Sequence, residues 1–507
     1  MTLLLTDLPA EILHHILGYV DPPDLVWIPR ICKRLYHAVS ENSALFKRVY
    51  LRHLDAPPRG PVDWERCLKD LVRLKKICGQ DNIDKKKDEL DFVHRAVTEL
   101  LKNASTDGTR PGAAVNIPQS YNAEFLTESF ASDSNQSAFL CRSFIYERAR
   151  AEFRSRDVTY WEGPPKPEHQ KSAHLHCLYG VPRLLAYPSA LPQSRQNLMH
   201  PFACSKVYDL RQYTVGSKWG PFMNDGSMRV DWEKVEAVMI VLGANMRHLN
   251  DSFTGMCKSF CSVPFAGTWP HSWQPRHLSP SLAARRAGER EREGEEPWEQ
   301  LDDPYGINGF WVRVVCFLDY SDFFAYNFSV EQPPPHIPRP SINVGQATRP
   351  IVMRMYVTSI EKPGPEDGQD LPVVHFKGFS KSLDQTDENA DSDFRGIVRM
   401  TPEGEVRWTG FSIFGGVERW RSESVQIGGV KSAKGVLGHW FDKDLDPRGP
   451  AGPTAFWKIA DMQKGPASPG SHLHAVLAEV DGIDNVYESD EDADEDDDNY
   501  FESDEEL

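Results

Sequence analysis

The sequence predicts an α+β protein in which a three-helix unit, a mainly helical middle region and an antiparallel β-barrel-like domain follow one another. Apolar residues recur at helical spacing over the first 50 residues and in stretches up to about residue 250. From about residue 308, short runs rich in β-branched and aromatic residues replace them. The C-terminal residues are mostly acidic, so we expect a disordered tail. The expected domains span residues 1–54, 62–260, 305–460 and 461–507, with a flexible charged insertion at 268–300.

The N-terminal unit has helical spacing but is too small to bury its own apolar side chains well. Pro9 suits a first helical turn, where its missing N–H costs no hydrogen bond, and Glu11 lies near the positive end of the helix dipole. Two apolar stripes flank the break at residues 21–23: Ile12, Leu13, Ile16, Leu17 and Val20, then Ile31, Cys32, Leu35, Tyr36 and Val39. About 50 residues form a weak core on their own. The unit therefore either docks on a partner or packs on the rest of its chain.

This segment resembles the F-box over residues 6 to about 50. The resemblance is carried by Leu8-Pro9, Glu11-Ile12-Leu13, Ile16-Leu17, the Asp-Pro-x-Asp-Leu of residues 21–25, and Cys32-Lys33-Arg34. Tyr36, where the family more often has Trp, and Pro29 depart from it. The resemblance implies binding to a Skp-type adaptor, which joins a cullin and a RING subunit in a ubiquitin ligase. The docking residues it indicates are Leu8, Pro9, Ile12, Leu13, Ile16, Leu17, Leu25, Ile31, Cys32 and Leu35.

Composition argues against several classes of protein. The net charge of −17 is local, because removing the tail from residue 484 onward leaves 57 basic against 60 acidic residues. A balanced body argues against nucleic-acid binding. Apolar runs are too short to span a bilayer, and no signal peptide is recognisable. Nine cysteines without a repeating spacing indicate reduced thiols, hence the cytosol or the nucleus.

The middle region is expected to be helical at residues 63–102, 121–155 and 169–180, with a further helix capped by Asp231. The triplet Lys85-Lys86-Lys87 is interpreted as a solvated helix face, with a nuclear signal as the alternative. Residues 276–300 are highly charged and poor in apolar residues, which indicates a mobile insertion.

Strands are expected in the C-terminal region, with turns between them. They are Phe310–Leu318, Ile351–Ile360, Ile397–Met400, Val406–Trp408, Phe411–Phe414, Ser424–Ile427, Val436–Phe441 and Phe456–Ile459. An extended, exposed proline-rich connector (residues 333–340) and an acidic loop (Asp384–Asp393) complete the pattern. Short strands at this spacing favour a closed antiparallel sheet.

A second resemblance spans most of the chain. Trp420 to Val430, Gly435 to Asp442, and Asp446-Pro447-Arg448-Gly449-Pro450 ending in Phe456-Trp457 are similar to segments of fungal F-box proteins of this length. Residues 172–180 and 219–232 are similar as well. Residues 305–460 resemble, more weakly, the β-barrel substrate domain of the vertebrate cyclin-D-binding F-box receptor. This implies that the barrel holds a protein target.

Enzymatic motifs are not recognised, and we expect neither catalysis nor a cofactor. There is no Gly-rich phosphate loop, and Gly410-Phe411-Ser412-Ile413-Phe414 lacks the second Gly of a nucleophile elbow. His169, His174, His176 and Cys177, or Cys257 and Cys261, contain metal-binding residue types but lack the paired spacings of zinc sites, so we expect no metal.

Two further sets of residues are candidates for recognition and regulation. Trp408, Trp420, Trp440 and Trp457 are candidate substrate contacts, because large rigid rings dominate binding hot spots, although most barrel tryptophans fill cores. Ser489 and Ser503 each precede an acidic residue by three positions, as acidophilic kinases prefer, although a solubilising tail explains the composition as well.

The sequence thus predicts a substrate-receptor subunit of a Skp–cullin–F-box ubiquitin ligase that recruits an unknown protein target. Two alternatives stay open. The β domain is also compatible with a small-molecule carrier whose turnover the F-box controls, and the F-box with an adaptor-bound scaffold that joins no cullin.

Overall fold

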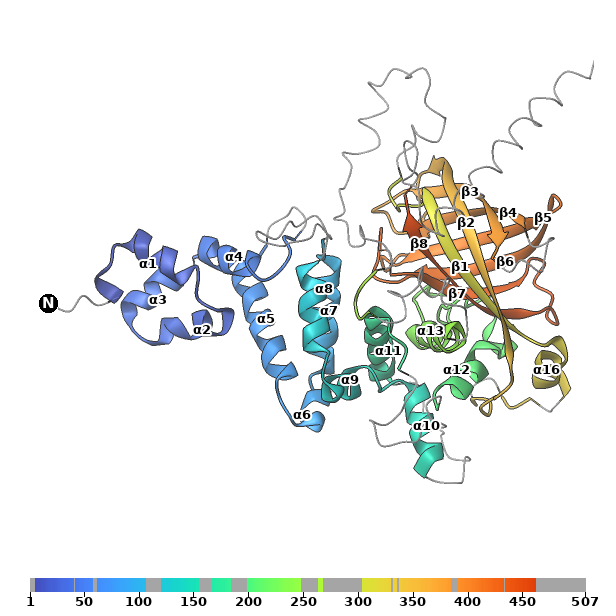
Figure 1. Ribbon diagram of the computed structural model, residues 1–507, viewed down its shortest axis with the longest axis horizontal. Coiled ribbons are helices and arrows are strands. Elements are labelled where there is room, and N and C mark those ends of the chain that lie inside the picture. Colours follow the sequence, from blue (N-terminus) through green and yellow to red (C-terminus); the bar gives the residue numbers. More distant parts are fainter. Residues whose placement is uncertain are drawn as a thin grey trace, which may run out of the picture.

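The computed structural model places the N-terminal unit and the β domain at opposite ends of the molecule, with helices between them (Figure 1). It describes residues 5–461 except 41, 58–61, 106–119, 155–165, 184–197, 248–262, 268–302, 330–331, 335–336, 384–390 and 433. The charged insertion, the acidic tail, Cys257, Cys261, Ser489 and Ser503 therefore lie outside the described residues.

The N-terminal unit consists of four short α-helices, preceded by a 3-10 turn at Leu5–Asp7. The helices are α1 (Ala10–Leu17), α2 (Pro22–Trp27), α3 (Lys33–Val39) and α4 (Ser43–Leu51), with a second 3-10 turn at Ile28–Arg30. Two arginines tie the helices together: Arg34 Nη2 donates to the Leu8 carbonyl at 2.8 Å, and Arg52 Nη1 donates to the Gly18 carbonyl at 2.9 Å.

The middle region is helical, as predicted. Its helices are α5 (Trp64–Cys78), α6 (Ile83–Lys87), α7 (Leu90–Lys102), α8 (Tyr121–Ser129), α9 (Asp133–Phe139), α10 (Phe144–Arg154), α11 (Pro167–Tyr179), α12 (His200–Val207) and α13 (Trp232–Met246). The Asp231 side chain caps α13 by accepting from the Lys234 amide, as expected. Helices α2 and α4 pack on α5, so the N-terminal unit packs against the helical region of its own chain.

The β domain is a closed, up-and-down antiparallel barrel, which confirms the predicted fold class. Its strands are β1 (Gly309–Leu318), β2 (Gln346–Glu361), β3 (Val373–Ser382), β4 (Ser392–Met400), β5 (Val406–Phe414), β6 (Val417–Gln426), β7 (Val436–Asp442) and β8 (Ala451–Ala460). Each pairs with its sequence neighbours, and β8 returns to β1, where Val314 lies opposite Ala455. Closure leaves no exposed sheet edge.

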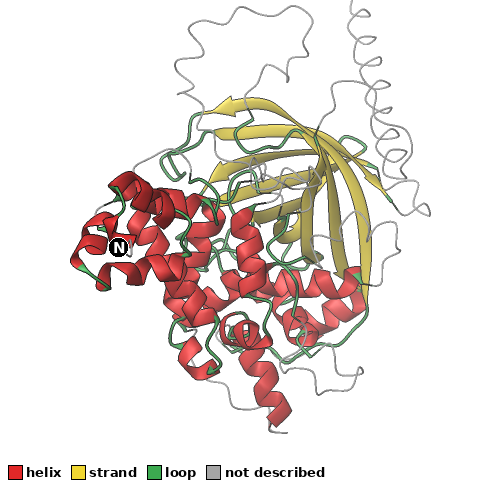
Figure 2. Ribbon diagram, turned by 60° about the vertical axis from the view of Figure 1, so that its left-hand side comes forward, coloured by secondary structure: helices red, strands yellow, loops and turns green. Residues whose placement is uncertain are grey.

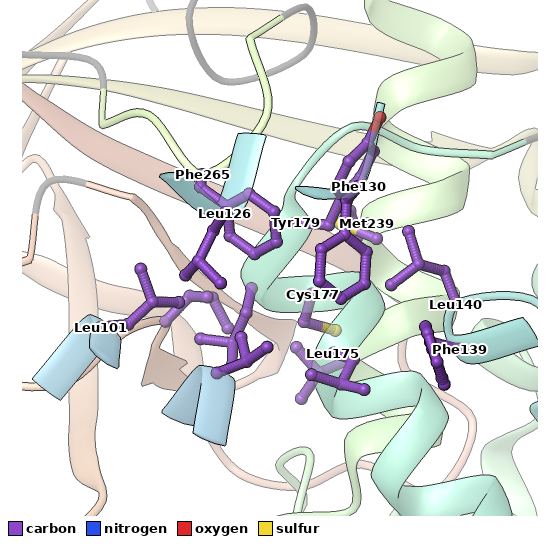
Figure 3. Close-up of a cluster of buried hydrophobic side chains, with 14 of the residues drawn as sticks. Leu101, Leu126, Phe130, Phe139, Leu140, Leu175, Cys177, Tyr179, Met239 and Phe265 are labelled. Carbon is purple, nitrogen blue, oxygen red and sulfur yellow. The ribbon is translucent and has the colours of Figure 1, made fainter. Parts of the chain in front are cut away.

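One hydrophobic cluster joins the N-terminal unit, the helical layer and the outside of the barrel. Helix α13 contacts β1, β2, β7 and β8, and its apolar residues are buried almost all round, which is why its stripe pattern is weak. The helices cover one side of the barrel (Figure 2). Leu101, Leu126, Phe130, Leu175 and Met239 meet between α7, α8, α11 and α13 (Figure 3). Such continuous packing favours a stiff connection between the two ends.

A second cluster fills part of the barrel interior. Trp311 packs at a steep angle against Trp408 and Phe456, with ring centroids 5.4 and 5.9 Å apart, and the Phe376 ring centroid lies 5.5 Å from that of Trp408. Inward and outward side chains alternate, so Val312 and Val314 of β1 join the cluster under the helices instead.

Several sequence expectations need correction. Lys86 is not part of a solvated face: it is buried, and its Nζ donates to the Cys78 carbonyl, Ser134 Oγ and Asn135 Oδ1. Strand β3 was not predicted, and the two strands expected within 406–414 are one continuous strand, β5. A short helix, α16 (Tyr320–Phe324), precedes the proline-rich connector, and within the connector the Arg339 side chain is buried rather than exposed.

Candidate functional site

The N-terminal unit exposes large apolar side chains on the outside of its helices. Ile12 and Ile16, one turn apart on α1, are 49% and 38% exposed, and Ile31 is 70% exposed. Leu5 and Tyr36 are also half exposed. Meanwhile Leu13 and Leu17, on the opposite side of α1, are buried. Helix α1 is therefore apolar on both sides: one side packs into the unit, and the other side is open to solvent.

The ten residues predicted for docking fall into three groups. Exposed ones are Pro9, Ile12, Ile16 and Ile31, partly exposed ones are Leu8 and Cys32, and buried ones are Leu13, Leu17, Leu25 and Leu35. The buried leucines fill the unit's own core, so substituting them tests its folding before it tests docking. The isoleucines of the set are the large side chains that are open to solvent.

Comparison with known protein families matches residues 5–52 to the family described as F-box-like. The N-terminal unit is an F-box-like domain. F-box domains typically bind Skp-type adaptors and are generally non-catalytic. The comparisons with curated proteins and with solved structures returned no match.

A buried carboxylate fixes the junction between the F-box-like domain and the helical layer. The Asp55 carboxylate accepts from Ser120 Oγ at 2.5 Å and from the amides of Ser105, Tyr121 and Asn122 at 2.9–3.3 Å. Burial raises its pKa, and these hydrogen bonds act in the opposite direction. Asn122 completes the junction by accepting from the Asp55 amide and donating to the Leu100 carbonyl.

A cavity of about 430 Å³ opens to solvent at the end of the barrel where β1 leaves the sheet. It is lined by Val315, Phe317, Leu318, Phe323, Ile351, Phe414, Trp420 and Trp440, together with Arg313, Arg349, Asp319, Tyr320, Ser380, Ser392, Ser412, Pro450 and Ala451. The volume falls within the range of small-molecule sites. The barrel is thus packed with aromatic side chains at one level and hollow at another.

The four candidate tryptophans occupy different places. Trp420 and Trp440 line the cavity, edge to face, with centroids 5.2 Å apart. Trp408 is buried in the aromatic core of the barrel, and its Nε1 donates to Gln426 Oε1. Trp457 faces the helical layer on the outside of the barrel. Only the first two of these four therefore lie where a bound molecule meets them directly.

Arg313 is a charged cavity residue that sequence reasoning missed. It lies on β1, in register with Trp311 and Val315 on the inward side of the strand. A lone arginine inside the otherwise apolar run Phe310–Leu318 was the available signal. Alternation alone does not show which side of a strand faces the barrel interior when both sides are buried.

The histidines considered as metal ligands have other partners. The His169 Nε2 lies 3.2 Å from Glu147, His176 Nδ1 lies 2.6 Å from Glu236, and His174 stacks on Trp232 at 3.7 Å. Within the described ranges, no group of three or more His, Cys, Asp or Glu side chains is placed to hold a metal ion. Likewise, none of the described helices is long and apolar enough to cross a membrane.

Proposed function

We propose that the protein is the substrate-recognition subunit of a Skp–cullin–F-box ubiquitin ligase. The observation that supports this most is the F-box-like domain with its exposed Ile12, Ile16 and Ile31. Isolated exposed apolar residues are common on protein surfaces, but several large ones within one 48-residue domain of adaptor-binding type favour an interface.

The mechanism is proximity rather than catalysis by this chain. The adaptor would link the F-box-like domain to a cullin and a RING subunit, while the barrel domain holds the protein target. Tethering raises the effective concentration of the target near the charged conjugating enzyme, to the millimolar range for short tethers. The continuous packing from F-box to barrel supports this role, because a stiff spacer limits where the target can lie.

The docking claim is tested by calorimetric titration of the purified full chain with a Skp-type adaptor. We expect the double variant Ile12→Glu/Ile16→Glu to weaken binding at least a hundredfold, because two charges would be buried in an apolar interface. Ile83→Glu is the matched control, since Ile83 is an equally exposed isoleucine on α6, outside the F-box-like domain. Equal affinity of the double variant and the control would refute the assignment.

A further inference from the structure

The barrel cavity contains a buried cation without an anionic partner. Arg313 is 5% exposed, and its Nε donates to Thr454 Oγ1 at 3.1 Å while Nη1 donates to Ser412 Oγ at 3.3 Å. Its guanidinium carbon lies 5.5 Å from the Phe394 ring centroid. Among the described residues, Nη2 donates to no protein atom and no carboxylate lies within ion-pair distance of Arg313.

This arrangement is costly for the protein alone. Buried arginines are normally paired, because an uncompensated charge loses its hydration without regaining it from a partner. Burial lowers the pKa of the Arg313 guanidinium to about 10, so it remains cationic at neutral pH. The acidic residue that lines the cavity, Asp319, accepts instead from the Ser321 amide at the start of α16.

The rest of the cavity fits an amphipathic molecule. Hydroxyl groups of Ser412 and Thr454 flank the guanidinium. The apolar part of the wall includes Phe317, Trp420 and Trp440. The Arg313 guanidinium beside the Ser412 hydroxyl suits a carboxylate, since a guanidinium pairs with a carboxylate through two parallel hydrogen bonds. Arg349 adds a second positive charge to the cavity wall, whereas the Thr454 hydroxyl donates its proton to the Val314 carbonyl.

We propose that this cavity binds a small apolar molecule that carries one carboxylate, such as a medium-chain fatty acid. Its carboxylate would lie on Arg313, next to Ser412 and Thr454, and its apolar part would contact Phe317, Trp420 and Trp440. The proposal rests on the geometry of the barrel and does not depend on the ligase role. The proposed ligand class is thus that of small apolar monocarboxylates.

The test is calorimetric titration of the full chain with decanoate, below the concentration at which decanoate forms micelles. The neutral decan-1-ol and the cationic decylammonium ion serve as matched probes. We expect decanoate to bind at least tenfold more tightly than decan-1-ol, and decylammonium to bind least, because Arg313 attracts only the anion. Absence of decanoate binding, or tighter binding of decan-1-ol or decylammonium, would overturn the proposal.

Variants locate the binding within the barrel. Arg313→Met should weaken decanoate at least tenfold while leaving decan-1-ol nearly unchanged, whereas Arg395→Met, on the outward side of β4 and paired with Glu418, should change neither. Val315→Phe keeps Arg313 but fills the cavity, so it should abolish binding of both molecules. If Arg313→Met does not fold, the comparison of the three probes and the Val315→Phe variant test the proposal instead. Unchanged decanoate affinity in folded Arg313→Met or in folded Val315→Phe would contradict binding at this cavity.

Discussion

At the scale of single residues, the histidine pair His94 and His174 links folding to pH. The His94 Nε2 lies 3.0 Å from His174 Nδ1, and His174 is stacked on Trp232. Burial lowers the pKa of His94 from 6.5 to about 4, and that of His174 well below its ordinary value. Both rings are therefore neutral in the folded protein at neutral pH.

The sign of the pH dependence follows from these pKa shifts. Above pH 6.5 His94 is neutral in both the folded and the unfolded chain, so it contributes no pH dependence. As the pH falls from 6.5 to 4, His94 binds a proton in the unfolded chain but not in the folded chain, so the free energy of unfolding decreases. At pH 5 this loss amounts to about 2 kcal/mol. In urea unfolding at pH 7 and 5, His94→Gln should lose correspondingly less stability than the wild type; equal losses would contradict the prediction.

Asp55 carries the second prediction at this scale. Replacing it by alanine leaves the amides of Ser105, Tyr121 and Asn122 without their acceptor in a buried junction. We expect Asp55→Ala to lower the free energy of unfolding by about 3 kcal/mol, and Asp55→Asn by less, because an amide oxygen still accepts. Asp84→Ala, at a fully exposed position, is the control in the same chemical denaturation series. A loss for Asp55→Ala no larger than for this control would show that the junction does not depend on the carboxylate.

At the scale of elements, the close approach of β6 and β7 depends on Gly438. A Cβ at this position would lie 2.1 Å from the Glu423 carbonyl oxygen and 2.3 Å from Ser424 Oγ. Gly438→Ala should therefore force the two strands apart and lower stability by about 1–3 kcal/mol. Gly345→Ala is the control, since a Cβ there meets nothing within 4 Å. Thermal unfolding of the two variants separates them, and equal melting temperatures would contradict this account of the β6–β7 pairing.

The elements that sequence reasoning predicted are those with a clear period. Helices α5 and α7 and strand β1 lie where the apolar spacing indicated them, and α13 begins where the Asp231 cap indicated it. Strand β3 was missed because Lys377, Gly378 and Lys381 interrupt its apolar pattern, and Gly378 has low strand propensity. Gly378 nevertheless fits, since a Cβ there would meet the Arg354 carbonyl of β2 at 2.1 Å. The strand propensity of glycine does not reflect this close contact with the neighbouring strand β2.

The candidate sites, like the elements, could be predicted only where local spacing determines them. The F-box spacing placed the correct helices in the sequence, but it did not separate the exposed Ile12 and Ile16 from the buried Leu13 and Leu17, because both sides of α1 are apolar. The lysine triplet was misjudged at Lys86, since its acceptors Ser134 and Asn135 lie on α9, far away in the sequence. Long-range partners of this kind are not visible in local spacing.

At the scale of the whole molecule, the protein joins an F-box-like domain to a hollow barrel through a continuous helical core. The arrangement supports a receptor that holds its target at a fixed distance from the adaptor. It also places a ligand-sized cavity at one end of the barrel, which is the proposed target-binding domain. The receptor role and the carboxylate site are therefore separable claims that different variants test.

The receptor role is tested most directly by affinity purification and mass spectrometry of the full chain under proteasome inhibition, comparing the wild type, Ile12→Glu/Ile16→Glu and Ile83→Glu. We predict that the wild type and Ile83→Glu recover a Skp-type adaptor, a cullin and a RING subunit. The double variant should lose all three while its other partners persist or accumulate. Recovery of the adaptor without any cullin by the wild type would contradict the ligase role and leave an adaptor-bound scaffold.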